Sequence, residues 1–442
     1  MLYVTNTLTG KKELFTSPTD NVNMYVCGIT PYDYAHLGHG RCYVSFDLLT
    51  RVLRFLGYNV VYGRNFTDID DKILNKAQQE FGDIHRYPEI TEKYINAFHK
   101  DVAALNCLAP HFEPRVTLMV PEIIIFIKKL IDKGHAYVAG SDVYFAVDTF
   151  DQYGKLSHHK IQDLIAGQRI EPSNKKKNPL DFALWKGTTD TSFFKSPWGY
   201  GRPGWHIECS VMAADLFGPS CDIHGGGRDL IFPHHENEIA QSESLSGQPM
   251  ARYWLHNGFV QINNEKMSKS LGNFFTLRDI FELADPMLVR YYFLTHHYRA
   301  PLDFSFHDLK SLEKSYKRLT RVFDKICPVV DQRTMSSSPI VQKMVSYLYD
   351  DLNTSGMFGV LFDNLEILQK NELELCAVKQ FLQNVLGLTL DPLPETQAAI
   401  TSEIQTLLDE REKARSQKDW QKADQLRAQL QELGFEVQDK KL

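Results

Sequence analysis

The sequence predicts an α/β protein, with a parallel sheet in its first part and helices in its last part. Two apolar runs, Val22–Cys27 and Tyr58–Tyr62, are typical of buried strands. Between them, at about 39–56, apolar residues recur at helical spacing, and Gly57 is placed to end that helix. A strand, a helix and a strand within about forty residues indicate a βαβ unit with parallel strands. After Asp303 the apolar residues recur every three or four positions, which indicates helices.

A different pattern interrupts the α/β region. One apolar helix is expected at 121–134, followed by a short strand at Val143–Val147 and a basic stretch, NKKKNP. We interpret this region as an insertion, because the α/β pattern resumes from Gly204. Near the C-terminus we expect one helix at about 404–417 and another from Asp419 to Gly434. The apolar face expected for the last helix consists of Trp420, Ala423, Leu426, Leu430 and Leu433.

These patterns predict a chain of several domains, as its 442 residues require. We expect the α/β domain at 1–110 and 200–265, a connective insertion at 111–199, a region at 266–310 with the KMSKS loop and the expected contacts to a nucleic-acid stem, a helical bundle at 311–395 and a small C-terminal domain at 396–442.

The composition excludes several classes of protein. A hydrophobic content of 43% is that of a globular protein, and the net charge of -6 means that any nucleic-acid surface must be local. The longest apolar run, Ile123–Ile127, is too short to cross a membrane, and the first residues lack the pattern of a signal peptide. The seven scattered cysteines, with no CxxC pair, predict free thiols and a reducing cytoplasm.

Two short motifs are suited to binding phosphates. HLGHGR (His36–Arg41) places two histidines around a glycine where the first helix begins, and helix-entry amides and imidazoles can hold phosphate. KMSKS (Lys266–Ser270) places two lysines on an expected loop, where ammonium groups can stabilise the charge of a leaving pyrophosphate. Taken alone, each motif is more often an exposed polar loop.

The stretch FPHHENE contains candidate metal ligands. His234 and Glu238 are four residues apart, on one face of a helix if it begins near the proline. A zinc site needs further ligands, and Cys27 at a strand end and Cys209 near a helix start are thiol candidates. Taken singly, a cysteine is more often buried packing and a His–Glu pair more often surface electrostatics. If His235 is the ligand instead, the expected helix register is wrong by one residue.

The order of these motifs resembles a class I aminoacyl-tRNA synthetase. The stretches YVCGITPYDYAHLGHGR, RNFTDIDDKI, GRPGWHIECS, DIHGGGRDLIFPHHENEIAQSE and EKMSKSLGNFF together resemble the bacterial type of cysteinyl-tRNA synthetase, from about Met1 to Val437. HLGH has Leu where the family signature usually has Ile, a change that keeps the side-chain volume. The chain ends KKL where many bacterial members continue with Gly-Thr and Trp-Arg, so we expect a shortened C-terminal domain.

The resemblance implies a Rossmann-like catalytic domain and a two-step reaction. Cysteine and ATP would form cysteinyl-adenylate and pyrophosphate, and cysteine would then pass to the 3′ end of tRNA(Cys). One zinc ion per chain is implied, bound by Cys27, Cys209, His234 and Glu238, together with magnesium on the ATP. The implied cysteine pocket consists of Gly28, Thr30, Thr67, Trp205 and His224. The implied ATP-binding residues are His36, Gly38, His39, Gly226, Asp229, Lys266 and Lys269, of which His36, His39, Lys266 and Lys269 are also catalytic.

The implied zinc ion suggests how cysteine is distinguished from serine. Apolar contacts separate near-isosteres by only about 1–3 kcal/mol. A thiol ionises and binds zinc far more readily than an alcohol does, so we expect zinc to select the substrate and no editing domain to be needed. We also expect a cytoplasmic monomer that contacts tRNA, but no membrane, through local basic faces. The candidate faces are Lys310, Lys314, Lys317, Arg318 and Arg321 in one group, and Lys413, Arg415, Lys418, Lys422 and Arg427 in another.

Three other functions fit parts of the pattern. A ligase that activates cysteine for mycothiol-type biosynthesis would share the catalytic domain, but it does not need residues 400–437. A zinc hydrolase is disfavoured because HExxH is missing and KMSKS is present. A non-catalytic RNA-binding relative has no physical need of both phosphate motifs.

Overall fold

The computed structural model of the chain describes residues 1–158, 175–262, 265–266 and 274–394 and, in the last part, 406–407, 409–411, 413–414, 417 and 419–432. Its contacts divide the chain into two units, Met1–Pro392 and Leu393–Leu442. Among the described helices, none has the length and apolar content needed to cross a membrane.

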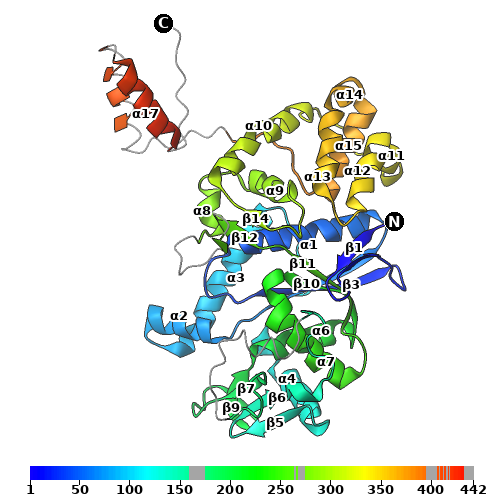
Figure 1. Cartoon of the computed structure of the whole chain (residues 1–442), viewed down its shortest axis with the longest axis vertical. Coiled ribbons are helices and arrows are strands. Elements are labelled where there is room, and N and C mark those ends of the chain that lie inside the picture. The colour runs from blue at the N-terminus through cyan, green and yellow to red at the C-terminus, as the bar shows by residue number, and fades with distance from the viewer. Residues whose placement is uncertain are drawn as a thin grey trace. The chain divides into compact units, whose positions relative to one another are not determined.

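A four-stranded parallel sheet forms the centre of the first unit (Figure 1). Its strand order is β11–β10–β3–β4, and β3 pairs with β4 and with β10 in parallel register. The predicted α/β fold is therefore confirmed, and β3, α1 and β4 form the expected βαβ unit. The elements are β3 (Asn21–Ile29), α1 (Leu37–Phe55), β4 (Asn59–Phe66), β10 (Cys221–Gly227) and β11 (Ala251–Asn257).

Helix α1 is buried on all sides, whereas the sequence predicted a single apolar face. Every residue from Gly40 to Leu53 is buried, because the helix lies between the sheet and the helices α9 and α15 (Figure 1). Its polar side chains therefore need partners inside the protein. The Asp47 carboxylate accepts hydrogen bonds from Arg51 Nε (2.7 Å) and from the fully buried Arg290 (2.5 Å). This ion-pair group fastens α1 to the helical region.

An antiparallel sheet fills most of the region predicted to be an insertion. Its strand order is β5–β6–β7–β9–β8, and helix α4 packs against β5 and β9 at the lower end of Figure 1. Before this region, α2 and α3 follow β4, and after it α6 and α7 flank β10. The bounds are α2 (Asp71–Phe81), α3 (Tyr87–Ala104), α4 (Val120–Asp132), β5 (Ala136–Ala139), β6 (Asp142–Phe145), β7 (Phe182–Gly187), β8 (Phe194–Ser196), β9 (Gly199–Pro203), α6 (Trp205–Phe217) and α7 (Glu236–Ser246).

The rest of the first unit is mainly helical, as predicted. A three-stranded sheet, in the order β13–β12–β14, lies between the parallel sheet and the helices. The N-terminal hairpin of β1 and β2 joins the helical part, since Thr5 N donates to Asp351 Oδ1 at 2.8 Å. The bounds are β1 (Tyr3–Asn6), β2 (Lys11–Leu14), β12 (Val260–Ile262), β13 (Glu265–Lys266), α8 (Leu277–Phe281), α9 (Pro286–Leu294), β14 (Leu302–Asp303), α10 (Phe306–Val322), α11 (Gln332–Ser337), α12 (Pro339–Leu348), α13 (Thr354–Asp363), α14 (Leu365–Lys370) and α15 (Glu372–Val385).

The helical bundle contains a disulfide between Cys327 and Cys376, which the sequence did not predict. The expectation of free thiols is wrong for this pair and holds for the other five cysteines, which are free. Cys327 lies just after α10 and Cys376 lies in α15, at a sequence separation of 49, so only the folded bundle brings the two sulfurs together.

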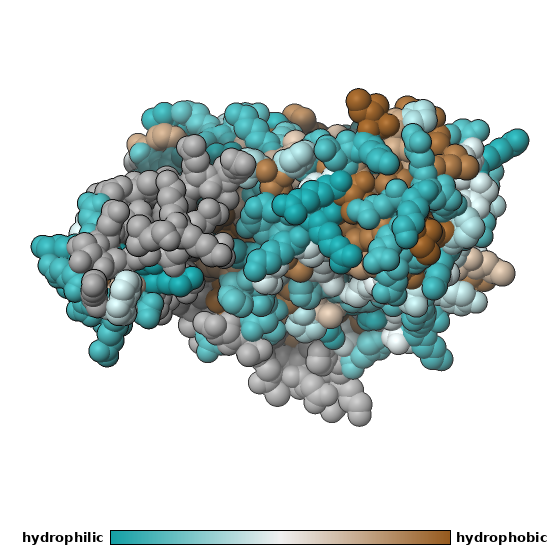
Figure 2. Space-filling model, turned by 90° about the horizontal axis from the view of Figure 1, so that it is seen from above, coloured by the Kyte–Doolittle hydropathy of each residue, from teal (hydrophilic) through white to brown (hydrophobic). Residues whose placement is uncertain are grey.

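The surface of the bundle is partly apolar. Figure 2 views the molecule from this side and shows hydrophilic residues over most of the face, with hydrophobic residues gathered over the bundle. The exposed apolar side chains there include Ile326, Val329, Ile367 and Leu373.

The described part of the second unit contains α17 (Trp420–Glu432). Ala423 and Leu426 are buried against Ala414, as the predicted apolar face requires. Trp420, which the sequence placed on the same face, is the first residue of α17 and is 58% exposed, so it is not part of that small core. Lys413, Lys422 and Arg427 are exposed, whereas the predicted positions Arg415, Lys418 and Leu433 lie outside the described residues.

Candidate active site and metal centre

The candidate site lies at the carboxyl ends of the central parallel strands, where ligands bind in open α/β sheets. Cys27 is near the end of β3, Thr67 directly follows β4, and His224 lies in the second half of β10. The N-terminal parts of α6 and α7 complete the site with Cys209 and Glu238. Each group thus comes from a different element of one rigid framework.

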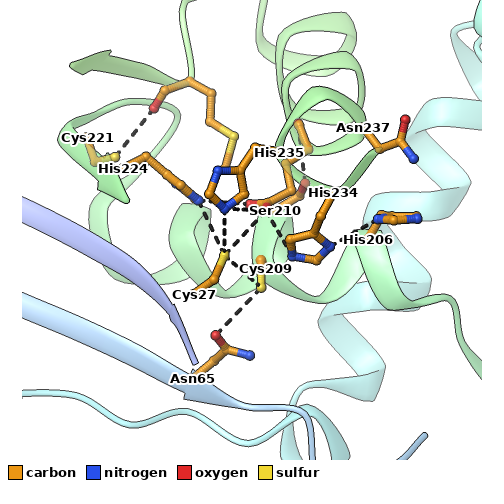
Figure 3. A network of polar contacts seen from close by, with 12 residues as sticks. Cys27, Asn65, His206, Cys209, Ser210, Cys221, His224, His234, His235 and Asn237 are labelled. Atoms are coloured by element: carbon orange, nitrogen blue, oxygen red, sulfur yellow. Dashed lines mark hydrogen bonds and ion pairs between the residues drawn. The ribbon is translucent and has the colours of Figure 1, made fainter. Parts of the chain in front are cut away.

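Four buried side chains meet there in a cluster that could hold a metal ion (Figure 3). One ligand atom from each of Cys27, Cys209, His234 and Glu238 lies within 4.8 Å of the others. The two sulfurs are 3.7 Å apart, and Glu238 Oε1 lies 3.5 Å from Cys27 Sγ and 3.0 Å from His234 Nε2. The structure therefore brings together the four residues that the resemblance implied.

A second set of donors overlaps the first. Cys27, His224, His235 and Glu238 also lie within 4.8 Å of one another. His224 Nε2 is 3.6 Å from Cys27 Sγ and 3.2 Å from Glu238 Oε2, while His235 Nε2 is 3.3 Å from the same sulfur. Geometry alone thus allows either the first set, with Cys209 and His234, or the second.

The chemistry of the first set fits a metal ion. Two sulfurs, an imidazole nitrogen and a carboxylate oxygen are the donor types of a four-coordinate site for a borderline-soft cation. Glu238 Oε2 is buried and makes no hydrogen bond among the described residues, and its nearest described partner is His224 Nε2 at 3.2 Å, so the carboxylate is available to a cation. Burial lowers the pKa of His234 to about 3, so the imidazole is neutral and can donate a lone pair. Burial, helped by the hydrogen bond with Cys209, raises the pKa of Cys27, so a metal must displace its proton.

The two histidines of FPHHENE point in different directions (Figure 3). His234 Nδ1 contacts His206 Nδ1 at 3.0 Å, whereas His235 Nδ1 contacts His256 Nε2 at 2.8 Å. His256 in turn contacts Thr7 Oγ1 at 2.8 Å. Each imidazole of the pair is therefore oriented through its second nitrogen, an arrangement that fixes the tautomer of a metal-binding histidine.

Glu236 and Asn237, to which the sequence assigned no role, bind the segment 153–157 inside the insertion. The fully buried Glu236 carboxylate accepts backbone hydrogen bonds from Gly154 (2.9 Å), Leu156 (3.1 Å) and Ser157 (2.8 Å). Asn237 Oδ1 accepts a bond from the Tyr153 hydroxyl at 2.5 Å. Glu236 and Asn237 of α7 thus contact the segment 153–157, and the next residue, Glu238, belongs to the metal cluster.

Four of the five residues implied for the cysteine pocket border this cluster. Gly28 cannot be replaced, since a Cβ there would lie 1.6 Å from the Asn65 carbonyl oxygen. The Thr67 hydroxyl donates to Glu208 Oε2 at 2.8 Å, and His224 lies against the cluster. Trp205 is 38% exposed, so it is no core residue, and its ring stacks on His234 at 4.3 Å. Thr30 follows β3, and the described contacts do not tie its side chain to the cluster.

Several residues around the pocket were missed by sequence reasoning. Asn65 accepts a hydrogen bond from Gly28 N at 2.8 Å and lies 3.6 Å from Cys209 Sγ. Burial raises the pKa of Glu208 well above its usual value, although the hydrogen bond from Thr67 opposes this. The sequence offered one signal for Asn65 and Glu208: each is a polar residue close to a strand end or to a candidate ligand. Many other polar residues share that property, so the signal could not identify these two.

The HLGH motif forms the N-terminal cap of α1. His36 Nδ1 accepts a bond from His39 N (3.2 Å), His39 Nδ1 accepts one from His36 N (3.3 Å), and the rings stack at 3.6 Å. Since both Nδ1 atoms accept, the neutral rings carry their protons on Nε2 and present N–H donors. Burial and the neighbouring His36 lower the pKa of His39. Gly38 leaves space for this arrangement, because a Cβ there would lie 2.9 Å from His36 Cε1.

The remaining implied ATP-binding residues are only partly described. Gly226 lies in β10, where a Cβ would meet Leu230 at 2.9 Å, and Asp229 is exposed in the short turn that follows. The backbone of Lys266 pairs with Gln261 in the β12–β13 hairpin. Lys269 lies outside the described residues.

Two parts of this chain match known protein families. Residues 15–314 match the family described as tRNA synthetases class I (C) catalytic domain, and residues 397–442 match the cysteinyl-tRNA ligase anticodon binding domain. A "Cysteine--tRNA ligase" of Maridesulfovibrio salexigens is 44% identical over 98% of this chain and 97% of its own length. One from Pseudomonas aeruginosa is 45% identical over 100% of this chain and 98% of its own.

Solved structures share the fold at low sequence identity. The methionyl-tRNA synthetase of Mycobacterium tuberculosis with methionyl-adenylate superposes with a TM-score of 0.60 at 14% identity, covering 84% of this chain and 92% of that one. The leucyl enzyme of Agrobacterium radiobacter K84, in a ternary complex with tRNA, gives 0.58 at 12% identity over 86% and 87%. Both likenesses bear on the fold alone.

Proposed function

The chain belongs to the cysteine–tRNA ligase family of class I aminoacyl-tRNA synthetases, and from that premise we propose how its site carries out the reaction. It is an ATP-using ligase that joins cysteine to tRNA. Cysteine and ATP form cysteinyl-adenylate and pyrophosphate, and cysteine is then transferred to the 3′ end of tRNA(Cys). The observation that carries the proposed mechanism is the buried cluster of two thiols, an imidazole and a carboxylate beside an exposed tryptophan.

Selection of cysteine is assigned to this cluster. We propose that one zinc ion per chain is held by Cys27, Cys209, His234 and Glu238. When bound, zinc supplies a Lewis acid that prefers a thiolate to a hydroxyl as a ligand. Trp205, stacked on His234, gives the substrate side chain an apolar wall, and Gly28 lets it approach the strand closely. His224 and Thr67 border the same space, and we place Thr30 at the substrate's polar end.

Activation is assigned to groups that position and stabilise the phosphates. The substrate carboxylate attacks the α-phosphorus, and pyrophosphate leaves. His36 and His39 direct Nε2–H donors from the start of α1, where the helix dipole also favours negative charge. We assign Gly38, Gly226 and Asp229 to ATP binding, and Lys266 and Lys269 to the charge that develops on the phosphates. Magnesium bound to the ATP would add positive charge to that of the lysines and help to offset the charge of the phosphates.

We also assign roles to the domains, to the basic faces and to the cellular location of the chain. We propose residues 1–110 and 200–265 as the catalytic domain, 111–199 as its insertion and 266–310 as the region that reaches the tRNA stem. The bundle at 311–395 and the domain at 396–442 would bind the rest of tRNA(Cys), helped by the exposed lysines on α10 and α17. We propose a monomer that works in the cytoplasm, where the five free cysteines would stay reduced.

The test is cysteine-dependent ATP–pyrophosphate exchange followed by transfer of cysteine to total tRNA. Exchange and transfer are both expected, with serine strongly excluded. Removing the metal should lower the preference for cysteine, and an unchanged preference would refute the role of the cluster. Exchange without transfer would favour a ligase of mycothiol-type biosynthesis, although the match of residues 397–442 to an anticodon-binding family favours tRNA.

A further inference from the structure

Arg41, two residues after His39, has an unusual environment for a charged side chain. It is 1% exposed, and its guanidinium donates to four backbone carbonyls. Burial lowers its pKa to about 10, so it remains charged at neutral pH. Among the described residues no carboxylate forms an ion pair with it. Four carbonyl dipoles compensate the charge, so the described role of Arg41 is to fix the backbone segments to which it donates.

The four carbonyls belong to two turns far apart in the sequence. Arg41 Nη1 donates to Gly258 (3.2 Å) and Phe259 (2.8 Å), which lie between β11 and β12. Nη2 donates to His297 (3.1 Å) and Ala300 (2.5 Å), which lie between α9 and β14. The two turns lead into β12 and β14, which pair in parallel, and β12 pairs with β13, the strand that contains Lys266. Arg41 therefore holds the base of the sheet that supports Lys266.

The segment just before α8 is also hydrogen-bonded to the start of α1. Leu37 N donates to Phe275 O (3.3 Å), and Leu277 N donates to Ala35 O (2.7 Å). Gly40 packs closely against Leu277, where a Cβ would lie 2.7 Å from a methyl carbon. Among the described residues, 258–259 and 275–277 are therefore both hydrogen-bonded to α1 or to the residues just before it.

We propose that Arg41 is a positioning residue that sets the distance between the HLGH histidines and the strand carrying Lys266. It acts through backbone and need not touch ATP. A lysine cannot reproduce this contact, because one ammonium cannot span four carbonyls in two turns, whereas the planar guanidinium carries donors on two nitrogens that face different turns. The inference rests on the proposed roles of His36, His39 and Lys266 in holding phosphates.

The variants that test this are Arg41→Lys and Arg41→Met. The control is Arg290→Lys, which also alters a buried arginine with carbonyl contacts, to Leu105 (2.8 Å) and Leu386 (2.8 Å), but away from the β12–β14 sheet. In the Arg41 variants we expect kcat of ATP–pyrophosphate exchange to fall about ten- to a hundredfold, since misplacement by about 1 Å has that effect. KM for cysteine and the bound metal should not change. Amide hydrogen exchange at 258–262 and at 302–303 should become faster in the Arg41 variants. In Arg290→Lys the exchange at these residues should stay as in the wild type.

A further variant addresses the case in which Arg41→Met fails to fold. A Cβ at Gly258 would lie 2.2 Å from the Ala300 carbonyl oxygen, so Gly258→Ala separates the same two turns with Arg41 intact and should give the same change in kcat. The proposal is overturned if the Arg41 variants keep wild-type kcat or wild-type protection at 258–262. It is also overturned if Arg290→Lys lowers kcat equally at equal loss of stability. If the wild type itself shows no cysteine-dependent ATP–pyrophosphate exchange, the proposed function fails. Amide protection at 258–262 still tests whether Arg41 holds the two turns in place.

Discussion

Replacing Cys209 with serine separates the two donor sets that share Cys27 and Glu238. Cys209 belongs only to the set with His234, and His235 belongs only to the set with His224. If the first set holds the metal, Cys209→Ser removes a soft ligand, whereas His235→Gln leaves all four ligands in place. The two variants are therefore matched, and the comparison does not depend on how much a mutation at a buried site disturbs the fold.

The expected magnitudes follow from the contacts of each side chain. Loss of a residue that only supports a ligand lowers metal affinity about 10–100-fold, so loss of a ligand should lower it at least about 100-fold, or about 2.7 kcal/mol. His235, 3.3 Å from Cys27 Sγ, is a supporting residue in this account, and its loss should lower the affinity about tenfold. The metal-free Cys209→Ser protein should stay within about 1 kcal/mol of wild type, because Asn65 Oδ1, 3.6 Å from the sulfur, can accept the serine hydroxyl.

The assay is zinc titration against a competing chelator, with bound metal counted after gel filtration. Unfolding of each metal-free variant serves as the control for the fold. Retention of zinc by Cys209→Ser together with its loss from His235→Gln would refute the assignment and favour the second set. Equal loss in both would show that the ion contacts residues of both sets.

Three more predictions concern stability. Glu236→Ala leaves three backbone N–H groups, two of them buried, without their acceptor and should destabilise the protein by about 3–5 kcal/mol, seen in urea unfolding, with faster amide exchange at 154–157 and not in α15. Reduction of the Cys327–Cys376 disulfide, which closes a loop over a separation of 49 residues, should lower stability by about 2–4 kcal/mol in thermal unfolding; a similar effect of reductant on Cys376→Ser would contradict this. His39 has a lowered pKa, so the unfolded chain takes up its proton first as the pH falls below about 6.5, and stability should fall with it. His39→Gln should reduce the slope of unfolding free energy between pH 7 and pH 5.5, and an unchanged slope would assign that proton uptake to other groups.

Sequence patterns predicted the parts of the fold that depend on local periodicity. The βαβ unit and the later helices follow from apolar spacing, and both are confirmed. The single apolar face predicted for α1 was wrong because periodicity cannot tell how many layers will cover a helix. The burial of Arg41 illustrates this, since its carbonyl partners lie more than two hundred residues further along the chain.

The candidate site was predictable in its chemistry more than in its arrangement. The family resemblance implied that Cys27, Cys209, His234 and Glu238 share one site, and the structure places them together, while their binding of zinc stays a prediction. The contact between His235 and His256 and the competing donor set arise from tertiary packing, for which the sequence holds no periodic signal. The disulfide was missed for the same reason, since neither cysteine has a partner nearby in sequence.

The burial of the metal cluster has a kinetic consequence. The four side chains are at most 5% exposed, and α7 is buried from Glu236 to Ser242. The proposed substrate thiol reaches an ion held there from the side of Trp205, which is 38% exposed and stacked on His234, so a small chelator would enter through the same space. Bound cysteine would then slow the removal of the metal, and the free enzyme would lose its metal to a chelator faster than the enzyme with bound cysteine does.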